Sequence, residues 1–291
     1  MREQYKVLIW PPPRSGGGPT NAILRVTNEL RQYRVACTAN VLSLWRVALL
    51  NVGAGIRLDI LRLLRLGRRL VYRVDGCYSR RIFERQGRPW LTTYEHINAR
   101  IASALATADF VIYQSHFAKQ HLDMLYERPA GIYDIVPNGV DLELFSPAGR
   151  SGDSLPTLGC IGKFRANRIK VLTDISRHLP IQHRLLLVGR LDEQCLQDLE
   201  TFRSSKPANC EVKYVSHVVG DEQLVRWHRQ IDCFLHPVIG DTCSNAVVEA
   251  LACGTPVIVP RWSGSSELVG QGGIVIEQPP WEDYQAFVHS C

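Results

Sequence analysis

Two carboxylates, Asp241 and Glu249, stand eight positions apart around the start of a predicted helix. From Asn245 to residue 253, small apolar residues alternate with the single acid Glu249, with Thr242 and Ser244 as candidate caps before them and a glycine and a proline after them. The free N–H groups and positive dipole end at the start of such a helix suit a phosphate or a carboxylate. The alternative is an ordinary strand–loop–helix unit in which Glu249 is merely solvated.

The spacing of the two acids argues against a glycosidase pair. If residues 241–249 were all helical, a rise of about 1.5 Å per residue would place the two acids about 12 Å apart. The paired carboxylates of glycosidases lie about 5 to 9.5 Å apart. Two acids spread along an elongated ligand fit the spacing better.

Residues 241–269, DTCSNAVVEALACGTPVIVPRWSGSSELV, resemble the signature of retaining glycosyltransferases of family 4, which are glycosyl transferases group 1 with the GT-B fold. PNGVD at 137–141 and ADFVIYQS at 108–115 are similar to the family as well. In the family the second acid binds the ribose of a nucleotide sugar and the first lies against the transferred hexose. The resemblance implies these roles for Glu249 and Asp241, although the first position more usually holds the longer Glu.

The elements that must position these acids form two successive arrays of alternating strands and helices. We expect strands at 5–10, 69–74, 108–113, 158–161, 184–188, 211–215, 233–235 and 255–260, and helices at 20–30, 93–107, 192–203 and 222–230. We also expect a helix after residue 115, a helix that bears Arg168 and Lys170, and a last strand of the first array at the PNGVD turn. Residues 146–156 read as a linker by composition. The predicted fold is α/β, with two facing Rossmann-like domains of GT-B type and an interdomain cleft. The boundaries are 1–148 for the acceptor-side domain and 149–291 for the nucleotide-sugar-binding domain, whose end is short for the family.

A glycine-rich loop, PPPRSGGGP at 11–19, follows the first predicted strand. It is neither GxGxxG nor a P-loop with GK[ST], so the dehydrogenase and NTPase interpretations are weak. The resemblance implies that Gly17 and Gly18 approach the donor diphosphate. The alternative is a flexible turn.

Polar residues also stand at the ends of the strands in the first array. Arg73 and Asp75 close the strand at 69–74, and His116 follows the strand at 108–113. Ligands of open parallel sheets bind outside this edge, and the resemblance places Asp75 in a catalytic position on the acceptor side, with Arg73 and His116 nearby. The alternative for Asp75 is a turn aspartate. Asn138 and Gly139 predict a positive-φ turn.

Departure of a nucleoside diphosphate leaves negative charge that must be stabilised. The chain contains no Asp-x-Asp motif to hold a divalent metal, so we expect no metal and no cofactor. By position within the family pattern, Lys163 is the first diphosphate cation, and Arg168 and Lys170 compete for the second. Arg190, Ser244 and Asn245 complete the expected donor-binding set.

The composition of the chain limits the classes of protein to which it can belong. The chain has 291 residues, 45% of them hydrophobic, and a net charge of +6, which suits anionic partners. Its nine cysteines form no CxxC pair, and no apolar run reaches a membrane span, so we expect a cytoplasmic protein. The basic stretch 56–73 leaves open peripheral contact with the anionic inner face of a membrane, or an ordinary surface helix. No nucleic-acid module is present, and the oligomeric state is left open.

The expected function is retaining, metal-independent transfer of a hexose in carbohydrate biosynthesis. The donor would be a nucleoside-diphosphate sugar, and the acceptor a glycan, a lipid-linked sugar or a small molecule. Two alternatives remain: a nucleotide-sugar-binding protein with weak catalysis, and a sugar-nucleotide epimerase on the same scaffold.

Overall fold

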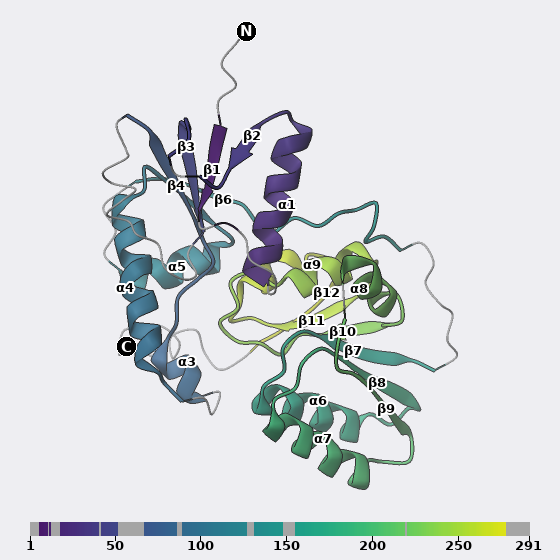
Figure 1. Cartoon of the computed structure of the whole chain (residues 1–291). Coiled ribbons are helices and arrows are strands. Elements are labelled where there is room, and N and C mark those ends of the chain that lie inside the picture. The colour runs from purple at the N-terminus through teal and green to yellow at the C-terminus, as the bar shows by residue number, and fades with distance from the viewer. Residues whose placement is uncertain are drawn as a thin grey trace. The chain divides into compact units, whose positions relative to one another are not determined.

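The computed structural model describes residues 6–10, 12, 18–40, 42–51, 67–85, 89–126, 131–147, 155–218 and 220–277. These residues form two compact units, each built on a sheet of six parallel strands (Figure 1). The chain passes from unit 1 to unit 2 between Gly139 and Val140. The prediction of two Rossmann-like α/β domains is confirmed, while the interdomain cleft stays a prediction.

The boundary between the units lies earlier than the predicted one after residue 148. Phe145 is fully buried and packs with Val225 of unit 2. The guanidinium of Arg229 donates a hydrogen bond to the carbonyl oxygen of Leu144 at 3.1 Å. Composition indicated a linker only from residue 146, where polar and small residues begin. The apolar residues just before it, such as Phe145, are already buried in unit 2.

Unit 1 has the strand order β2-β1-β3-β4-β5-β6. Its strands are β1 (Lys6–Trp10), β2 (Ala36–Thr38), β3 (Val47–Asn51), β4 (Arg69–Val74), β5 (Phe110–Tyr113) and β6 (Ile132–Ile135). Its described helices are α1 (Gly18–Gln32), α3 (Arg80–Arg85), α4 (Thr92–Thr107) and α5 (His116–Leu125).

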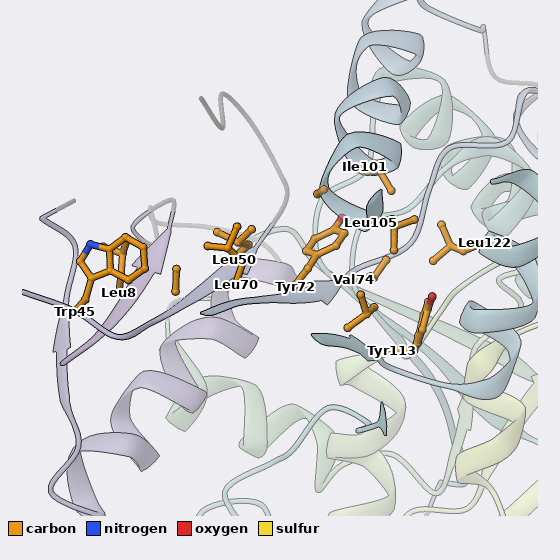
Figure 2. Packing of buried hydrophobic residues seen from close by; sticks show 13 residues of the cluster. Leu8, Trp45, Leu50, Leu70, Tyr72, Val74, Ile101, Leu105, Tyr113 and Leu122 are labelled. Carbon is orange, nitrogen blue, oxygen red and sulfur yellow. The ribbon is translucent and has the colours of Figure 1, made fainter. Parts of the chain in front are cut away.

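Successive residues of the unit 1 strands face opposite sides of the sheet. Leu8 joins the cluster that α4 and α5 cover, where Tyr72 lies against helix residues such as Leu105 (Figure 2). Ile9 joins the cluster on the other face, against Ile23 of α1. Burial on both faces is typical of parallel sheets, and it explains the continuous apolar run at residues 7–10 of β1.

Unit 2 has the strand order β12-β11-β10-β7-β8-β9. Its strands are β7 (Thr157–Ile161), β8 (His183–Val188), β9 (Cys210–Val215), β10 (Cys233–Leu235), β11 (Val257–Pro260) and β12 (Gly273–Ile276). Its helices are α6 (Ala166–His178), α7 (Glu193–Ser205), α8 (Gly220–His228) and α9 (Asn245–Ala252), with a short 3₁₀ turn η1 (Gly264–Leu268).

The two faces of the unit 2 sheet are covered by different helix pairs. Leu185 and Leu187 pack with residues of α6 and α7, while Leu186 and Val188 pack with residues of α8 and α9. Figure 1 shows these two helix pairs on opposite faces of the sheet. The helices hold the sheet from both sides and leave the strand ends to carry polar groups.

The structure adds elements that the sequence did not predict, namely β2, β3, α3, β12 and η1. Residues 56–66 of the basic stretch lie outside the described residues, as does Gly17. Within the part of the chain that the structure describes, no helix is long and apolar enough to cross a membrane.

Candidate functional site

The strand order of unit 2 marks one place for a ligand. The chain runs outward from β7 through β8 to β9, then returns to place β10 on the other side of β7. Read from the β9 edge, this is the 3-2-1-4-5-6 order of dinucleotide-binding folds, in which ligands bind outside the carboxyl ends of the strands where the order reverses. Lys163 follows β7 at this point and His236 follows β10.

Arg168, in the first turns of α6, folds back over the loop that follows β7. Its guanidinium donates to the carbonyl oxygens of Lys163 at 3.2 Å and Ile161 at 3.3 Å. It also lies 5.1 Å from the centre of the Phe164 ring. These contacts fix the course of the loop and hold a positive charge beside it.

His236 connects Arg168 with Asp241. Its Nε2 lies 2.9 Å from Asp241 Oδ2, and its Nδ1 lies 3.4 Å from Arg168 Nη2. Burial lowers the pKa of His236, and the charge of Arg168 adds to this effect against the opposing effect of Asp241. A neutral ring with its proton on Nε2 donates to the carboxylate and accepts from the guanidinium, so both contacts are hydrogen bonds only in that tautomer.

Asp241 lies in the loop before α9, so the continuous helix assumed for the 12 Å estimate does not form. Burial by itself raises the pKa of its carboxyl, but the His236 hydrogen bond, the Cys243 N–H and the Arg168 charge leave it below its ordinary value. The carbonyl oxygen of Asp241 also accepts from the Gly264 N–H at 2.6 Å. Asp241 is therefore an ionised, oriented carboxylate.

The other predicted cations are more exposed. Lys163, Lys170 and Arg190 all have exposed side chains. Lys163 lies directly in the loop that Arg168 holds, whereas Lys170 lies within α6, two residues after Arg168. Among the described residues, the structure therefore distinguishes Arg168, which is engaged with the loop, from Lys163, whose ammonium reaches solvent.

The start of α9 differs from the predicted capping arrangement. Ser244 is the N-cap residue, but its side chain makes no capping hydrogen bond. Its backbone N–H instead donates to the hydroxyl oxygen of Ser265 at 3.1 Å. The tertiary contact with η1 replaces the local cap, and Asn245 follows half-buried as the first helical residue.

Glu249 points into unit 2 and is almost fully buried. Its Oε2 lies 3.4 Å from Nε2 of His228 on α8, which is completely buried. The Glu249 carboxylate is thus held in a defined place at the side of α9 that faces α8. The alternative in which Glu249 is merely solvated is wrong.

Gly189 allows the carboxyl ends of β7 and β8 to approach closely. It has φ of +130°, and a Cβ at this position would lie 2.0 Å from the carbonyl oxygen of Gly162. A side chain here would therefore push the loop of Lys163 and Arg168 away from the β8 end.

We expect Gly189→Ala to destabilise unit 2 more than Gly220→Ala by about 1 to 3 kcal/mol. Gly220 also has positive φ, +77°, but a Cβ there meets nothing within 4 Å. The Gly220 variant thus reports the cost of replacing a positive-φ glycine where no atoms overlap. Urea unfolding measures both, and equal losses would contradict the close approach.

A second polar cluster lies at the carboxyl edge of the unit 1 sheet. Arg73 forms an ion pair with Asp75 and a hydrogen bond with the side-chain oxygen of Asn138. The Gln114 amide donates to Asp75 Oδ1 at 2.6 Å and to the Val74 carbonyl at 3.0 Å. Burial raises the pKa of Asp75, although Arg73 and Gln114 oppose the shift. The structure thus brings Arg73 and Asp75 together.

The predicted positive-φ turn at Asn138 and Gly139 is wrong, because neither residue has a positive φ. Asn138 serves instead as the partner of Arg73. His116 is the exposed first residue of α5, and the hydroxyl of Ser115 caps that helix by accepting from the Ala118 N–H at 3.0 Å. Gly18 is the first residue of α1.

Sequence reasoning missed four residues of these two sites: His228, His236, Gln114 and the side chain of Asn138. A signal existed for His236, which directly follows the short apolar run of β10, and for Gln114, which directly follows β5. Polar residues at the carboxyl ends of parallel strands are site candidates by position. Within the described residues, no three or more His, Cys, Asp or Glu side chains converge as metal ligands.

The chain is similar in sequence to known glycosyltransferases. Residues 155–290 match the family model described as glycosyl transferases group 1. A D-inositol 3-phosphate glycosyltransferase of Arthrobacter sp. (strain FB24) is 29% identical over 160 residues, which cover 50% of this chain and 38% of that protein. A GDP-mannose-dependent alpha-mannosyltransferase of Corynebacterium glutamicum is 28% identical over 158 residues, covering 50% of this chain and 35% of that protein. The chain thus spans well under half the length of these relatives.

Solved structures share the fold across nearly the whole chain. Anabaena HepE, crystallised with UDP and glucose, has a TM-score of 0.66 and 17% sequence identity, and the match covers 99% of this chain and 89% of that one. WaaG, a glycosyltransferase involved in lipopolysaccharide biosynthesis, has a TM-score of 0.64 and 12% identity, with 98% and 90% covered. Residues 155–290 are thus similar to the glycosyl transferases of group 1, and the whole chain shares the GT-B fold of two parallel-sheet units with these solved structures.

Proposed function

We propose that this chain is a retaining, metal-independent glycosyltransferase that moves a hexose from a nucleoside-diphosphate sugar to an acceptor. The observation that carries the proposal is the assembly of Arg168, His236 and Asp241 at the reversal point of the unit 2 sheet. An oriented carboxylate next to a cation-bearing loop suits a ligand with a sugar at one end and a diphosphate in the middle.

Nucleotide sugars are supported as the donor class by two relatives. Anabaena HepE has been crystallised with UDP-glucose, and the Corynebacterium relative is named as dependent on GDP-mannose. We propose that Asp241 orients the hexose of such a donor and that Glu249 binds its ribose. Lys163 and Arg168 would neutralise the diphosphate, with Lys170, Arg190, Ser244 and Asn245 at its margins.

The reaction that fits these residues is a front-face displacement. The bond between the anomeric carbon and the diphosphate oxygen breaks, and its electron pair stays on the diphosphate. The acceptor oxygen attacks the same face and gives its proton to the departing phosphate, so the anomeric configuration is kept. In this proposal Lys163 stabilises the charge that develops on the leaving group, which is the step where a fixed cation contributes most.

Unit 1 would supply the acceptor side. Asp75, half-buried beside the buried Arg73 and held by Gln114, offers a fixed carboxylate at the carboxyl edge of the sheet, and His116 lies exposed at the start of α5. We propose that this edge recognises hydroxyl groups of a glycan, a lipid-linked sugar or a small-molecule acceptor.

A thermal-shift screen of nucleoside diphosphates and their sugars tests the donor class. A ligand at about 100 times its dissociation constant adds about 2.7 kcal/mol to the free energy of unfolding. Transfer is then followed as release of the nucleoside diphosphate with a panel of acceptors, and NMR of the product reports the anomeric configuration. Binding without transfer would favour a donor-binding protein, and an altered sugar on the nucleotide would favour an epimerase.

We expect donor binding and turnover to persist in EDTA, because the chain has no Asp-x-Asp motif and the proposed stabilising charges are those of Lys163 and Arg168. Initial rates are measured with and without the chelator, after dialysis against it. Loss of activity that magnesium or manganese restores would contradict the metal-independent mechanism.

A further inference from the structure

The two acids of the candidate donor site have a pair of histidine partners with the same spacing. Asp241 and Glu249 are eight positions apart, and so are His228 and His236. His236 contacts Asp241 at 2.9 Å and His228 contacts Glu249 at 3.4 Å, each through Nε2. Each acid of the motif thus has its own histidine, delivered by the end of α8 or the end of β10.

Both histidines are held firmly. His228 is completely buried and His236 is 4% exposed. The ring of Phe234 contacts both, with centroids 5.6 Å from His228 and 6.4 Å from His236. The ring of Phe145 also packs against His228, with the two ring centroids 6.0 Å apart. The imidazoles therefore cannot turn easily, and they provide fixed donors for flexible carboxylates.

The polar contacts of the two rings lead to the acids. Nδ1 of His236 lies beside the Arg168 guanidinium, which fixes the proton on Nε2 and directs it to Asp241. Nδ1 of His228 has no hydrogen-bond partner within the described residues, so Nε2 toward Glu249 is its one recorded polar contact.

We propose that His228 and His236 are positioning residues, which hold Glu249 and Asp241 in the orientations that bind the donor. The inference rests on the proposed donor-binding roles of these acids. A carboxylate fixed before the ligand arrives loses less conformational entropy on binding than one that must be ordered by the ligand. Outer partners of this kind typically change affinity by about 10- to 100-fold when they are removed from metal ligands, and we expect the lower end here.

The test compares His236→Phe and His228→Phe, which keep the ring but lose both nitrogens, with His236→Gln and His228→Gln, which retain an N–H near the Nε2 position. Isothermal titration uses UDP, UDP-glucose, GDP and GDP-mannose. His236→Phe should weaken the nucleotide sugar about tenfold and spare the free nucleotide, while His228→Phe should weaken both about tenfold. The glutamine variants should recover most of each loss.

His183→Gln is the matched control. His183 is also a buried histidine of unit 2, but it lies at the opposite, amino end of β8, and its Nδ1 contacts the carbonyl oxygen of Ile181. It should bind all four probes as the wild type does. Thermal melting of each variant verifies folding before titration.

A measurement on the unaltered protein covers the case in which a phenylalanine variant does not fold. The ¹⁵N chemical shifts of the His236 ring should show a neutral imidazole protonated on Nε2 at pH 7. A protonated Nδ1 would overturn the proposed arrangement.

If the wild type binds the probes and the two phenylalanine variants bind them equally well, the positioning role is overturned and the proposed function stands. Equal losses in the Phe and Gln variants would overturn it too, because the hydrogen bond would not be what matters. A wild-type chain that binds none of the four probes would overturn the proposed function and this inference with it.

Discussion

Replacing Lys163 by alanine is expected to lower the turnover rate about a hundredfold or more, which is a larger effect than the loss in nucleoside binding. The ammonium is exposed in the loop after β7, beside the guanidinium that holds this loop in place. Its charge is most valuable when the diphosphate departs with an additional negative charge. Loss of one such transition-state contact typically costs about 2.7 to 4 kcal/mol.

Steady-state kinetics with saturating acceptor, together with titration of the nucleoside diphosphate, separates the two effects. Lys206→Ala is the control, since it removes the same charge from unit 2 at the residue after α7, where Nζ contacts the Cys210 carbonyl. A variant Lys163→Ala with an unchanged rate constant would move the role to Arg168 or Lys170.

The second large effect is expected at Glu249. If its carboxylate accepts hydrogen bonds from both ribose hydroxyls, each is worth about 1.5 to 3 kcal/mol, so Glu249→Ala should weaken the nucleoside diphosphate tenfold or more. Asp241→Ala should spare the free nucleotide and weaken the nucleotide sugar, because its partner would be the hexose. Calorimetric titration of both ligands into both variants makes the comparison.

Because Glu249 is buried, a pair of more conservative substitutions is tested beside the two alanine variants. Glu249 contacts the fully buried His228, so its truncation also removes a partner inside unit 2. Glu249→Gln and Asp241→Asn keep the shape of the side chain while removing its charge, and Glu211→Gln, at the exposed ion pair with Arg184, is the control. Equal losses for nucleotide and nucleotide sugar in both site variants would contradict the division between ribose and hexose.

Several elements could be located from the sequence because their signals are local. The strand predicted at 69–74 coincides with β4, and the one at 233–235 coincides with β10. In both cases a short apolar run is bounded by charged or turn-forming residues. β3 and β12 were not predicted, since short apolar runs of this kind cannot be told from parts of a helix by periodicity.

The site could be predicted only in part. Lys163, Arg168 and Asp241 could be placed near the ends of strands and helices, because apolar runs and turn-forming residues mark those ends in the sequence. Their mutual contacts did not follow, and Ser244 makes no side-chain cap, while its backbone N–H donates to the Ser265 hydroxyl in η1. A side chain that can cap its own helix can also be outcompeted by a contact from elsewhere in the chain.

The sequence by itself determined the two acids eight positions apart, the cation-bearing loop after β7 and the α/β alternation, because each depends on residues close together in the chain. The tertiary structure alone decided that His236 lies between Arg168 and Asp241. Arg168 and His236 are 68 positions apart, and they meet because β10 pairs with β7 in the sheet. Strand order results from packing of the whole unit, so no local pattern encodes which strand ends become neighbours.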